Sequence, residues 1–126
     1  MIYDSKGEKG KAIHHFETAL TIASPLGLSD ILFWIHYGLT QLFRVEGDFN
    51  NAHLHIEQAK IHAVDNRYQP GQAILVQALI YYGQNRLEDS ESEALSALKI
   101  FEGLGVQKYL EKCEDLLQDI GQATKS

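Results

Sequence analysis

The stretch Gly47-Asp48-Phe49-Asn50-Asn51-Ala52 has the pattern of a helix start, and the chain uses this pattern more than once. Gly47 ends the preceding element, Asp48 can cap the next helix, and apolar residues follow at helical spacing through Ala59. The same spacing occurs 40 residues earlier and 38 residues later, at Gly7, Ala12, Phe16 and Ala19 and at Asn85, Ser90, Ala94 and Ala97. A period of this length predicts a repeat with two helices per unit.

Apolar residues recur at three- and four-residue steps along most of the chain, which is typical of one face of a helix. We expect six helices, over about 8–24, 29–46, 48–66, 71–82, 85–102 and 106–120. No segment alternates apolar and polar residues for long enough to be a strand. The sequence therefore predicts an all-α protein with a single domain over 1–120. Its expected parts are units of about 1–28, 29–68 and 69–104, a capping helix over 105–120 and a flexible tail over 121–126.

Several expected helix ends carry residues that can bond free backbone amides. Ser29 or Asp30 can cap the second helix, and Asn85 with Glu88 resembles a capping box for the fifth. Pro70 suits the first position of the fourth helix. That fourth helix is apolar almost all round and should be the most buried, whereas the second has apolar residues on two sides and should pack on both.

Composition excludes several classes of function. The net charge is −6 and no basic stripe is present, which argues against a nucleic-acid partner. No apolar run approaches the ~20 residues of a membrane span, and the N-terminus has no signal-peptide pattern. Cys113 is the only cysteine, so no intrachain disulfide can form and a cytoplasmic location is the natural expectation.

Small residues at fixed places explain how two antiparallel helices of a unit can approach closely. Ala12, Ala52 and Ser90 suit one helix crossing, and Ala19, Ala59 and Ala97 suit the next layer. With Gly47, Asp48 and Phe49 before them, these positions resemble the tetratricopeptide repeat over roughly residues 3–100. The units match an extended variant of 38–40 residues in place of the usual 34. The resemblance implies a short right-handed α-solenoid that serves protein–protein interaction.

On this register we expect the chain to begin partway through a unit, with Tyr3 as the remnant of a first helix before Gly7. The face of Phe16 therefore lacks its expected partner. Three explanations stand open: the first helix covers this face differently, another chain covers it, or the sequence belongs to something longer. Because exposed ends of a solenoid invite self-association, a homodimer is a second possible assembly.

The resemblance implies that the first helix of each unit lines a concave groove. The residues expected to face it are Trp34, Tyr37, Gln41, Arg44, Gln72, Leu75, Leu79 and Tyr82. The Lys/Asn set that family members use to clamp a terminal carboxylate is missing, because Tyr37, Gln41, Leu75 and Leu79 occupy its places. An apolar, aromatic groove favours a peptide held by hydrophobic anchors, with Arg44 for orientation. Alternatively, Leu75 and Leu79 contact the next repeat, and Trp34 and Tyr37 are structural as well.

The histidines and carboxylates give no recognisable catalytic or metal-binding pattern. His55 and His62 share a helix face but lie two turns apart, which is too far for one Zn²⁺ unless other residues fold in. No nucleophile elbow or phosphate loop occurs. We therefore expect no enzymatic activity, no cofactor and no metal.

The favoured hypothesis is a non-enzymatic scaffold that binds a protein or peptide partner in the concave groove, without nucleic acid or membrane. The alternative is a structural module that associates with itself, or packs against the rest of a larger regulatory protein, without a peptide ligand. A small-molecule binder in the apolar groove is a third possibility.

Overall fold

The computed structural model describes residues 5–64 and 67–125, with side chains from residue 8 onward. This part of the chain is all-α, as predicted, and contains no strand. The helices are α1 Ser5–Ala23, α2 Ser29–Val45, α3 Phe49–His62, α4 Gln69–Gly83, α5 Leu87–Leu104 and α6 Gln107–Thr124, with a short 3-10 turn at Ser24–Leu26. Tyr3 and Asn66 lie outside the described residues.

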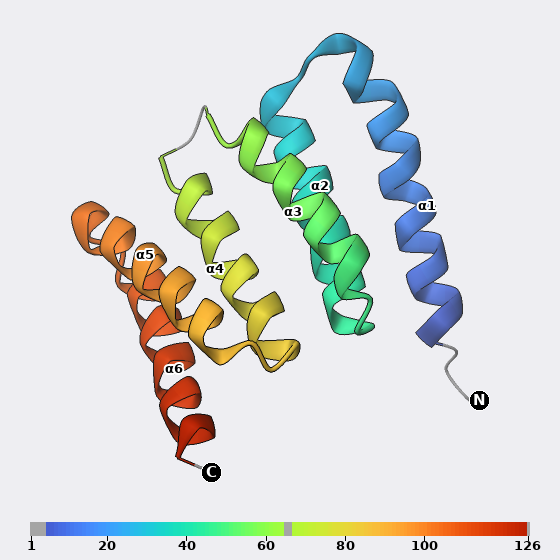
Figure 1. Ribbon diagram of the computed structural model, residues 1–126. Helices are drawn as coiled ribbons and strands as arrows, with labels where there is room; N and C mark the ends of the chain where they lie inside the picture. The colour runs from blue at the N-terminus through green and yellow to red at the C-terminus, as the bar shows by residue number, and fades with distance from the viewer. Residues whose placement is uncertain (1–4, 65–66, 126) are drawn as a thin grey trace.

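The helices stand side by side in chain order, with α1 at one edge of the molecule and α5 and α6 at the other (Figure 1). Each helix packs mainly on its neighbours in the chain, and α2 also packs on α1, as its two apolar sides predicted. Beyond chain neighbours, contacts join α2 to α4 and α4 to α6. These three alternate helices therefore form one continuous surface. The right-handed solenoid remains a prediction.

Four of the turns between helices each place one residue in the left-handed backbone region. Gly27, Gly47 and Gly105 have φ values of 61°, 79° and 68°, and Asn85 has φ 61°. Asn85 therefore replaces a turn glycine, and asparagine tolerates this backbone better than other side chains do. The predicted capping box at Asn85 is wrong, because α5 starts after Arg86 without a side-chain cap.

Of the other predicted helix caps, one forms and one does not. Asp48 caps α3, since its side chain accepts from the backbone N–H of Asn51. The predicted cap of α2 by Ser29 or Asp30 is wrong: Leu28 precedes the helix, and no side chain caps it. The Asp30 carboxylate instead accepts a hydrogen bond of 2.8 Å from Nε2 of Gln69 at the start of α4. Pro70 lies in the first turn of α4, one residue further in than predicted.

Two helices end elsewhere than the sequence suggested. Helix α3 ends at His62, four residues before the predicted end. Helix α6 continues to Thr124, where a tail from 121 was expected. Ile120 is buried and anchors this last turn, so the modest cost of Gly121 in a helix does not end it.

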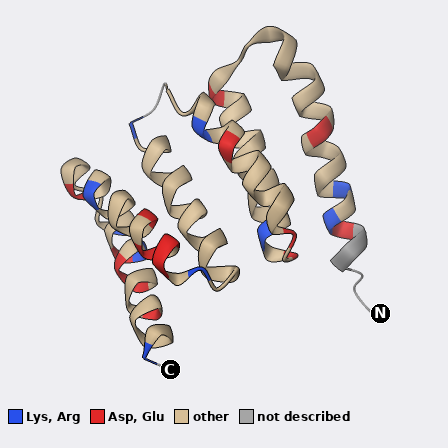
Figure 2. Cartoon of the chain, viewed as in Figure 1, with Lys and Arg blue, Asp and Glu red and all other residues tan. Residues whose placement is uncertain are grey.

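Helix α4 lies at the centre of the fold. Nine of its fifteen residues are buried, which agrees with the prediction that it is the most buried helix. It contains no charged residue, and Figure 2 shows it uncharged between helices that carry both signs. Its side chains contribute to two of the three apolar clusters, one shared with α2 and α3 and one with α5 and α6.

The crossings of α2 with α3 and of α4 with α5 bury the small residues that the repeat predicted, whereas Ala12 and Ala19 of α1 are only half-buried. Ala52, Ala59, Ser90 and Ala97 have no exposed surface. A hydroxyl accompanies each crossing, but on opposite helices: Thr40 of α2 in the first pair and Ser90 of α5 in the second. Thr40 bonds back to the carbonyl of His36 at 2.7 Å, whereas Ser90 bonds across to the carbonyl of Ala78 at 2.7 Å.

Phenylalanine rings rest on glycines where helices approach most closely. A β-carbon at Gly38 of α2 would lie 2.5 Å from the ring of Phe16 on α1. The same relation joins Gly71 to Phe101 and Gly83 to Phe49, at 2.7 and 2.9 Å. The half-buried ring of Phe16 therefore rests on α2 of the same chain, a cover that none of the three open explanations named.

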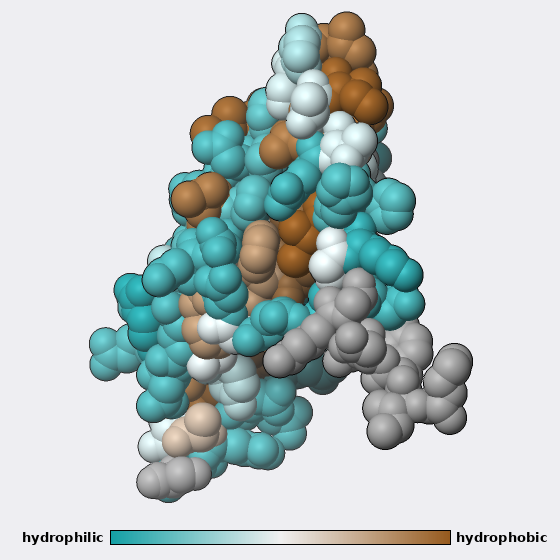
Figure 3. Space-filling model, turned by 90° about the vertical axis from the view of Figure 1, so that its right-hand side faces the viewer, coloured by the Kyte–Doolittle hydropathy of each residue, from teal (hydrophilic) through white to brown (hydrophobic). Residues whose placement is uncertain are grey.

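The face of the molecule on the side of α1 is partly apolar. Figure 3 shows brown surface at the turn between α1 and α2 and a hollowed brown strip below it, flanked by hydrophilic residues. The side chains of Ile22 and Leu26 near this turn are 64% and 65% exposed. In contrast, the outward side of α1 itself is polar, with His14, His15 and Thr18 exposed.

Candidate functional site

A hollow of about 370 Å³ opens between α2, α4 and α6. Four of the eight predicted groove residues meet there, and four residues of α6 complete it. The lining residues are Gln41, Arg44, Leu75, Leu79, Lys112, Asp115, Leu116 and Asp119. Because α2, α4 and α6 are the alternate helices that share a surface, this hollow occupies the place where the concave groove was expected.

Three leucines form the apolar floor of the hollow. Leu75 is only 6% exposed and packs with Phe101 and Cys113 in the cluster of α4, α5 and α6. The alternative that Leu75 contacts the following helices is therefore correct, although its edge still reaches the hollow. Leu79 also packs against this cluster, as the alternative predicted, but it is half-buried and leaves more surface open for a ligand.

Arg44 is a fixed cation on the α2 wall. Its Nε donates a 2.8 Å hydrogen bond to Oε1 of Gln41, and Gln41 in turn bonds the hydroxyl of Tyr37. Burial lowers the pKa of Arg44, an effect that Tyr37 opposes, and the guanidinium stays charged because its ordinary value is so high. Within the described residues Arg44 makes no ion pair, so its terminal nitrogens are available to a carboxylate.

The α6 wall carries charges of both signs. Lys112, Asp115 and Asp119 are exposed and lie at helical spacing on one face of α6. The Lys112 ammonium also lies 5.6 Å from the centre of the Tyr109 ring. A ligand on the leucine floor would thus have a cation on one side and mainly carboxylates on the other.

The remaining four predicted groove residues lie outside the hollow. Trp34 is 43% exposed and packs edge-on against Phe33 and Tyr37, so part of its ring is accessible to solvent outside the hollow. Burial raises the pKa of Tyr37, whose hydroxyl is hydrogen-bonded to the side chain of Gln41. Gln72 is buried, since its Nε2 donates to the hydroxyl of Tyr109 at 2.7 Å. Tyr82 packs against the core cluster of α4, α5 and α6.

Sequence reasoning missed the whole α6 wall. It treated residues 105–120 as a cap and used only the apolar positions of that helix. The available signal was the spacing of Lys112, Asp115 and Asp119, which places three charges on one face beside the apolar stripe.

Two of the three histidines of α3, His55 and His62, meet His36 of α2, whereas His53 bonds Gln84. The Nδ1 atoms of His36 and His55 are 3.0 Å apart, and the rings of His36 and His62 stack in parallel at 6.1 Å. Burial, reinforced by His55 and His62, lowers the pKa of His36 to about 4, and burial also lowers the pKa of His55. No group of three or more potential ligands in the described part of the chain is arranged to hold a metal ion.

These features define an all-α protein with a repeat-like helix arrangement and one mixed apolar and charged hollow on its alternate helices. No protein-family model, no curated protein and no solved structure matches the chain. No helix in residues 5–64 and 67–125 is long and apolar enough to cross a membrane.

Proposed function

We propose that this protein is a non-enzymatic interaction module of the tetratricopeptide type, which holds a segment of a partner protein in the hollow between α2, α4 and α6. The observation that carries the proposal is the combination of a leucine floor, whose open part is Leu79, with the Gln41-bonded guanidinium of Arg44, which makes no ion pair among the described residues. Hydrophobic anchoring supplies affinity, and the charged walls supply orientation.

The floor can bury one or two aliphatic or aromatic side chains of a partner. Full burial of such a side chain contributes roughly 1.5–3 kcal/mol, before the cost of ordering the segment. Arg44 would meet a carboxylate of the partner, while Asp115 and Asp119 would meet a cation. The partner we propose is therefore a short segment with an apolar anchor between charges of opposite sign.

Peptide display on the full chain tests this proposal. We expect selection of peptides that carry such an anchor, and a loss of at least tenfold in their affinity for Leu79→Glu and Arg44→Glu. Leu54→Glu, at an exposed position of α3, is the matched control and should bind normally. Failure to select any peptide, or equal binding by all three variants, would contradict the proposal.

Self-association is the second candidate function, because apolar residues at the α1–α2 turn are exposed. Ile22, Leu26 and Leu28 lie there within a few residues of one another. The exposed residues of α1 and α6 are mostly polar, which favours the monomer because association surfaces are typically apolar patches. Light scattering distinguishes the two: a mass of 14.2 kDa supports the interaction module, and twice that mass supports the dimer.

We also propose that the protein works in the cytoplasm. Cys113 is the single cysteine and is fully buried in the cluster of α4, α5 and α6. Burial, with Glu114 nearby, raises the pKa of its thiol to about 11, so the thiolate that would form a disulfide is scarce at neutral pH.

A further inference from the structure

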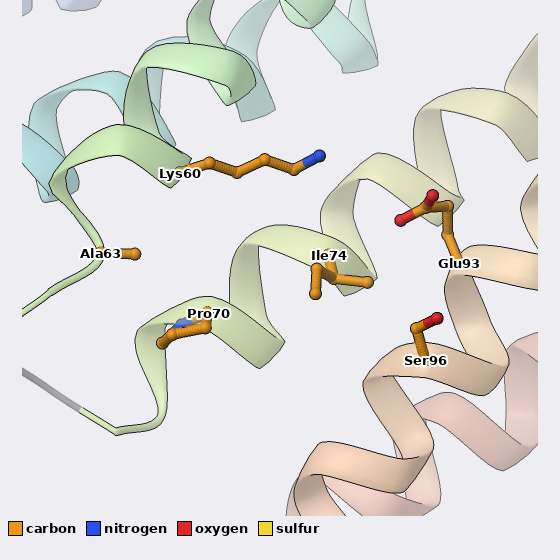
Figure 4. Close-up of a pocket in the computed structure, with 6 residues that line it drawn as sticks. All are labelled: Lys60, Ala63, Pro70, Ile74, Glu93 and Ser96. Atoms are coloured by element: carbon orange, nitrogen blue, oxygen red, sulfur yellow. The ribbon is translucent and has the colours of Figure 1, made fainter.

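A second pocket, of about 320 Å³, lies where the end of α3, the start of α4 and the middle of α5 meet (Figure 4). It shares no lining residue with the hollow between α2, α4 and α6. Its lining residues are Lys60, Ala63, Pro70, Ile74, Glu93 and Ser96. This volume is at the lower end of the range for small-molecule sites, about 300–1,000 Å³.

The α3 wall supplies one positioned cation. Lys60 extends over α4 toward α5 in Figure 4, and its ammonium donates to the side-chain oxygen of Gln77. It also forms an ion pair of 3.4 Å with the exposed carboxylate of Glu57 on the same helix, to which it donates a second proton. Gln77 is buried and therefore holds Lys60 in place. An ammonium has three protons, so one remains for a ligand.

The α5 wall supplies acceptors. The Glu93 carboxylate points back toward α3 in Figure 4, and no hydrogen bond or ion pair joins it to another described residue. Ser96 donates its proton to the carbonyl of Ser92 at 3.1 Å, which leaves its oxygen free to accept. The α5 wall is therefore suited to a ligand group that donates several hydrogen bonds. The α3 wall is suited to a ligand group that accepts a hydrogen bond.

The floor between the two walls is apolar. Ala63, Pro70 and Ile74 are half-buried, and none of their side chains can form a hydrogen bond. A ligand that satisfied both walls would place its remaining atoms on this floor and remove apolar surface from water. The pocket is thus complementary to a small molecule that carries an anionic, a cationic and an apolar group.

We propose that this pocket binds a free amino acid with an apolar side chain. Its α-carboxylate accepts from Lys60, its α-ammonium donates to Glu93 and Ser96, and its side chain lies on Pro70 and Ile74. The inference is independent of the function proposed for the hollow, because the two sites have no residue in common.

Calorimetric titration of the full chain with L-leucine tests the ligand class. We expect leucine to bind, and three derivatives to bind at least tenfold more weakly: N-acetyl-leucine lacks the ammonium, leucinamide lacks the carboxylate, and glycine lacks the side chain. Absence of binding by leucine would overturn the proposal, and so would equal binding of leucine and leucinamide.

Variants locate the site on these walls. Glu93→Gln should weaken leucine binding at least tenfold, while Glu91→Gln, at an exposed position of the same helix, should leave it unchanged. Lys60→Met should also abolish binding, but Lys60 bonds the buried Gln77, so circular dichroism must show that this variant folds. Leucine binding that survives Glu93→Gln would overturn the assignment.

Discussion

The helix pairs α2–α3 and α4–α5 follow the same repeat but differ at one layer. The first pair places His36, His55 and His62 between its helices, with their rings stacked. The positions 38 residues further on are Ile74, Glu93 and Ile100. Ile74 and Glu93 line the second pocket, so the layer that imidazoles fill in one pair is open in the other.

This difference shows how a repeat can acquire a site without a change of backbone. Both pairs keep small residues at their crossings, which fixes the distance between the helices. The side chains of the neighbouring layer then decide whether the space is filled. Aromatic rings of the first pair occupy it, whereas one branched aliphatic side chain and one carboxylate leave room for a ligand.

The largest expected effect tests the difference in side-chain size between matching positions at the helix crossings. Ile56 is fully buried in the first pair, and Ala94 occupies the matching place in the second. Ile56→Ala should lower the free energy of unfolding by about 2–5 kcal/mol, because a cavity remains. Ala94→Ile should lower it by about 1–3 kcal/mol through overpacking. Urea unfolding measures both, and an unchanged midpoint for either would contradict the assigned register.

The second prediction concerns acid pH and only the first pair. The pKa of His36 is about 4 in the folded protein, against an ordinary value of 6.5. Between these values the unfolded chain binds more protons, so the free energy of unfolding should fall as the pH drops from 6.5 toward 4. The loss should be at most about 3 kcal/mol.

The control for this prediction makes the first pair resemble the second. His36→Ile installs the residue found at position 74 and removes the titrating ring. His55 on α3 and Glu17 on α1 still face this layer, so some pH dependence should remain. Urea unfolding at pH 7 and pH 4.5 should show a smaller difference for the variant, and an equal difference would rule His36 out as the cause.

The third prediction compares the turns that join the two helices of each pair. Gly47 and Asn85 both adopt positive φ. Gly47→Ala should lower the free energy of unfolding by about 1–2 kcal/mol, because a β-carbon strains this backbone. Asn85→Ala should cost less, since asparagine lacks the freedom of glycine already. Thermal unfolding measures the order, and a larger loss at Asn85 would show that its side chain has another role.

The smallest expected effect tests the hydroxyl at each crossing, which Thr40 of α2 supplies in the first pair and Ser90 of α5 in the second. Ser90→Ala should cost about 1 kcal/mol, because it removes a buried hydrogen bond to the Ala78 carbonyl. In the first pair, adding Ala52→Ser to Thr40→Ala should recover part of the loss that Thr40→Ala causes alone. A double-mutant cycle measures this coupling, and additive losses would contradict the exchange.

The sequence was sufficient for the helices and for the small residues buried in the pairs α2–α3 and α4–α5, because both depend on periodic patterns that a single chain displays. It was wrong for Ala12 and Ala19 of α1, which are only half-buried. It was less reliable for caps, since Asp30 bonds a distant residue in α4 in place of its own helix. It also misplaced the end of α6, where Ile120 is held by packing that no local rule reveals.

For the candidate site, the sequence predicted Gln41, Arg44, Leu75 and Leu79 together, from one resemblance and one helical spacing. It could not place α6 beside them, because the position of a terminal helix depends on tertiary contacts. It also could not predict that Gln72 is buried, because its hydrogen-bond partner Tyr109 lies 37 residues away. The pocket of Lys60 and Glu93 was equally out of reach, since its walls come from two repeat units.

Because α4 carries no charge, varying the ionic strength can separate the contribution of the apolar floor to ligand affinity from that of the charged walls. Leu75 and Leu79 form part of one floor and Ile74 part of the other, while every charged lining residue belongs to α2, α3, α5 or α6. In 1 M salt the screening length is about 3 Å, so exposed wall charges lose most of their attraction. Contacts with the apolar floors persist there, so the affinity that survives high salt reports mainly on the floors, to which α4 contributes Leu75 and Leu79 at one site and Pro70 and Ile74 at the other.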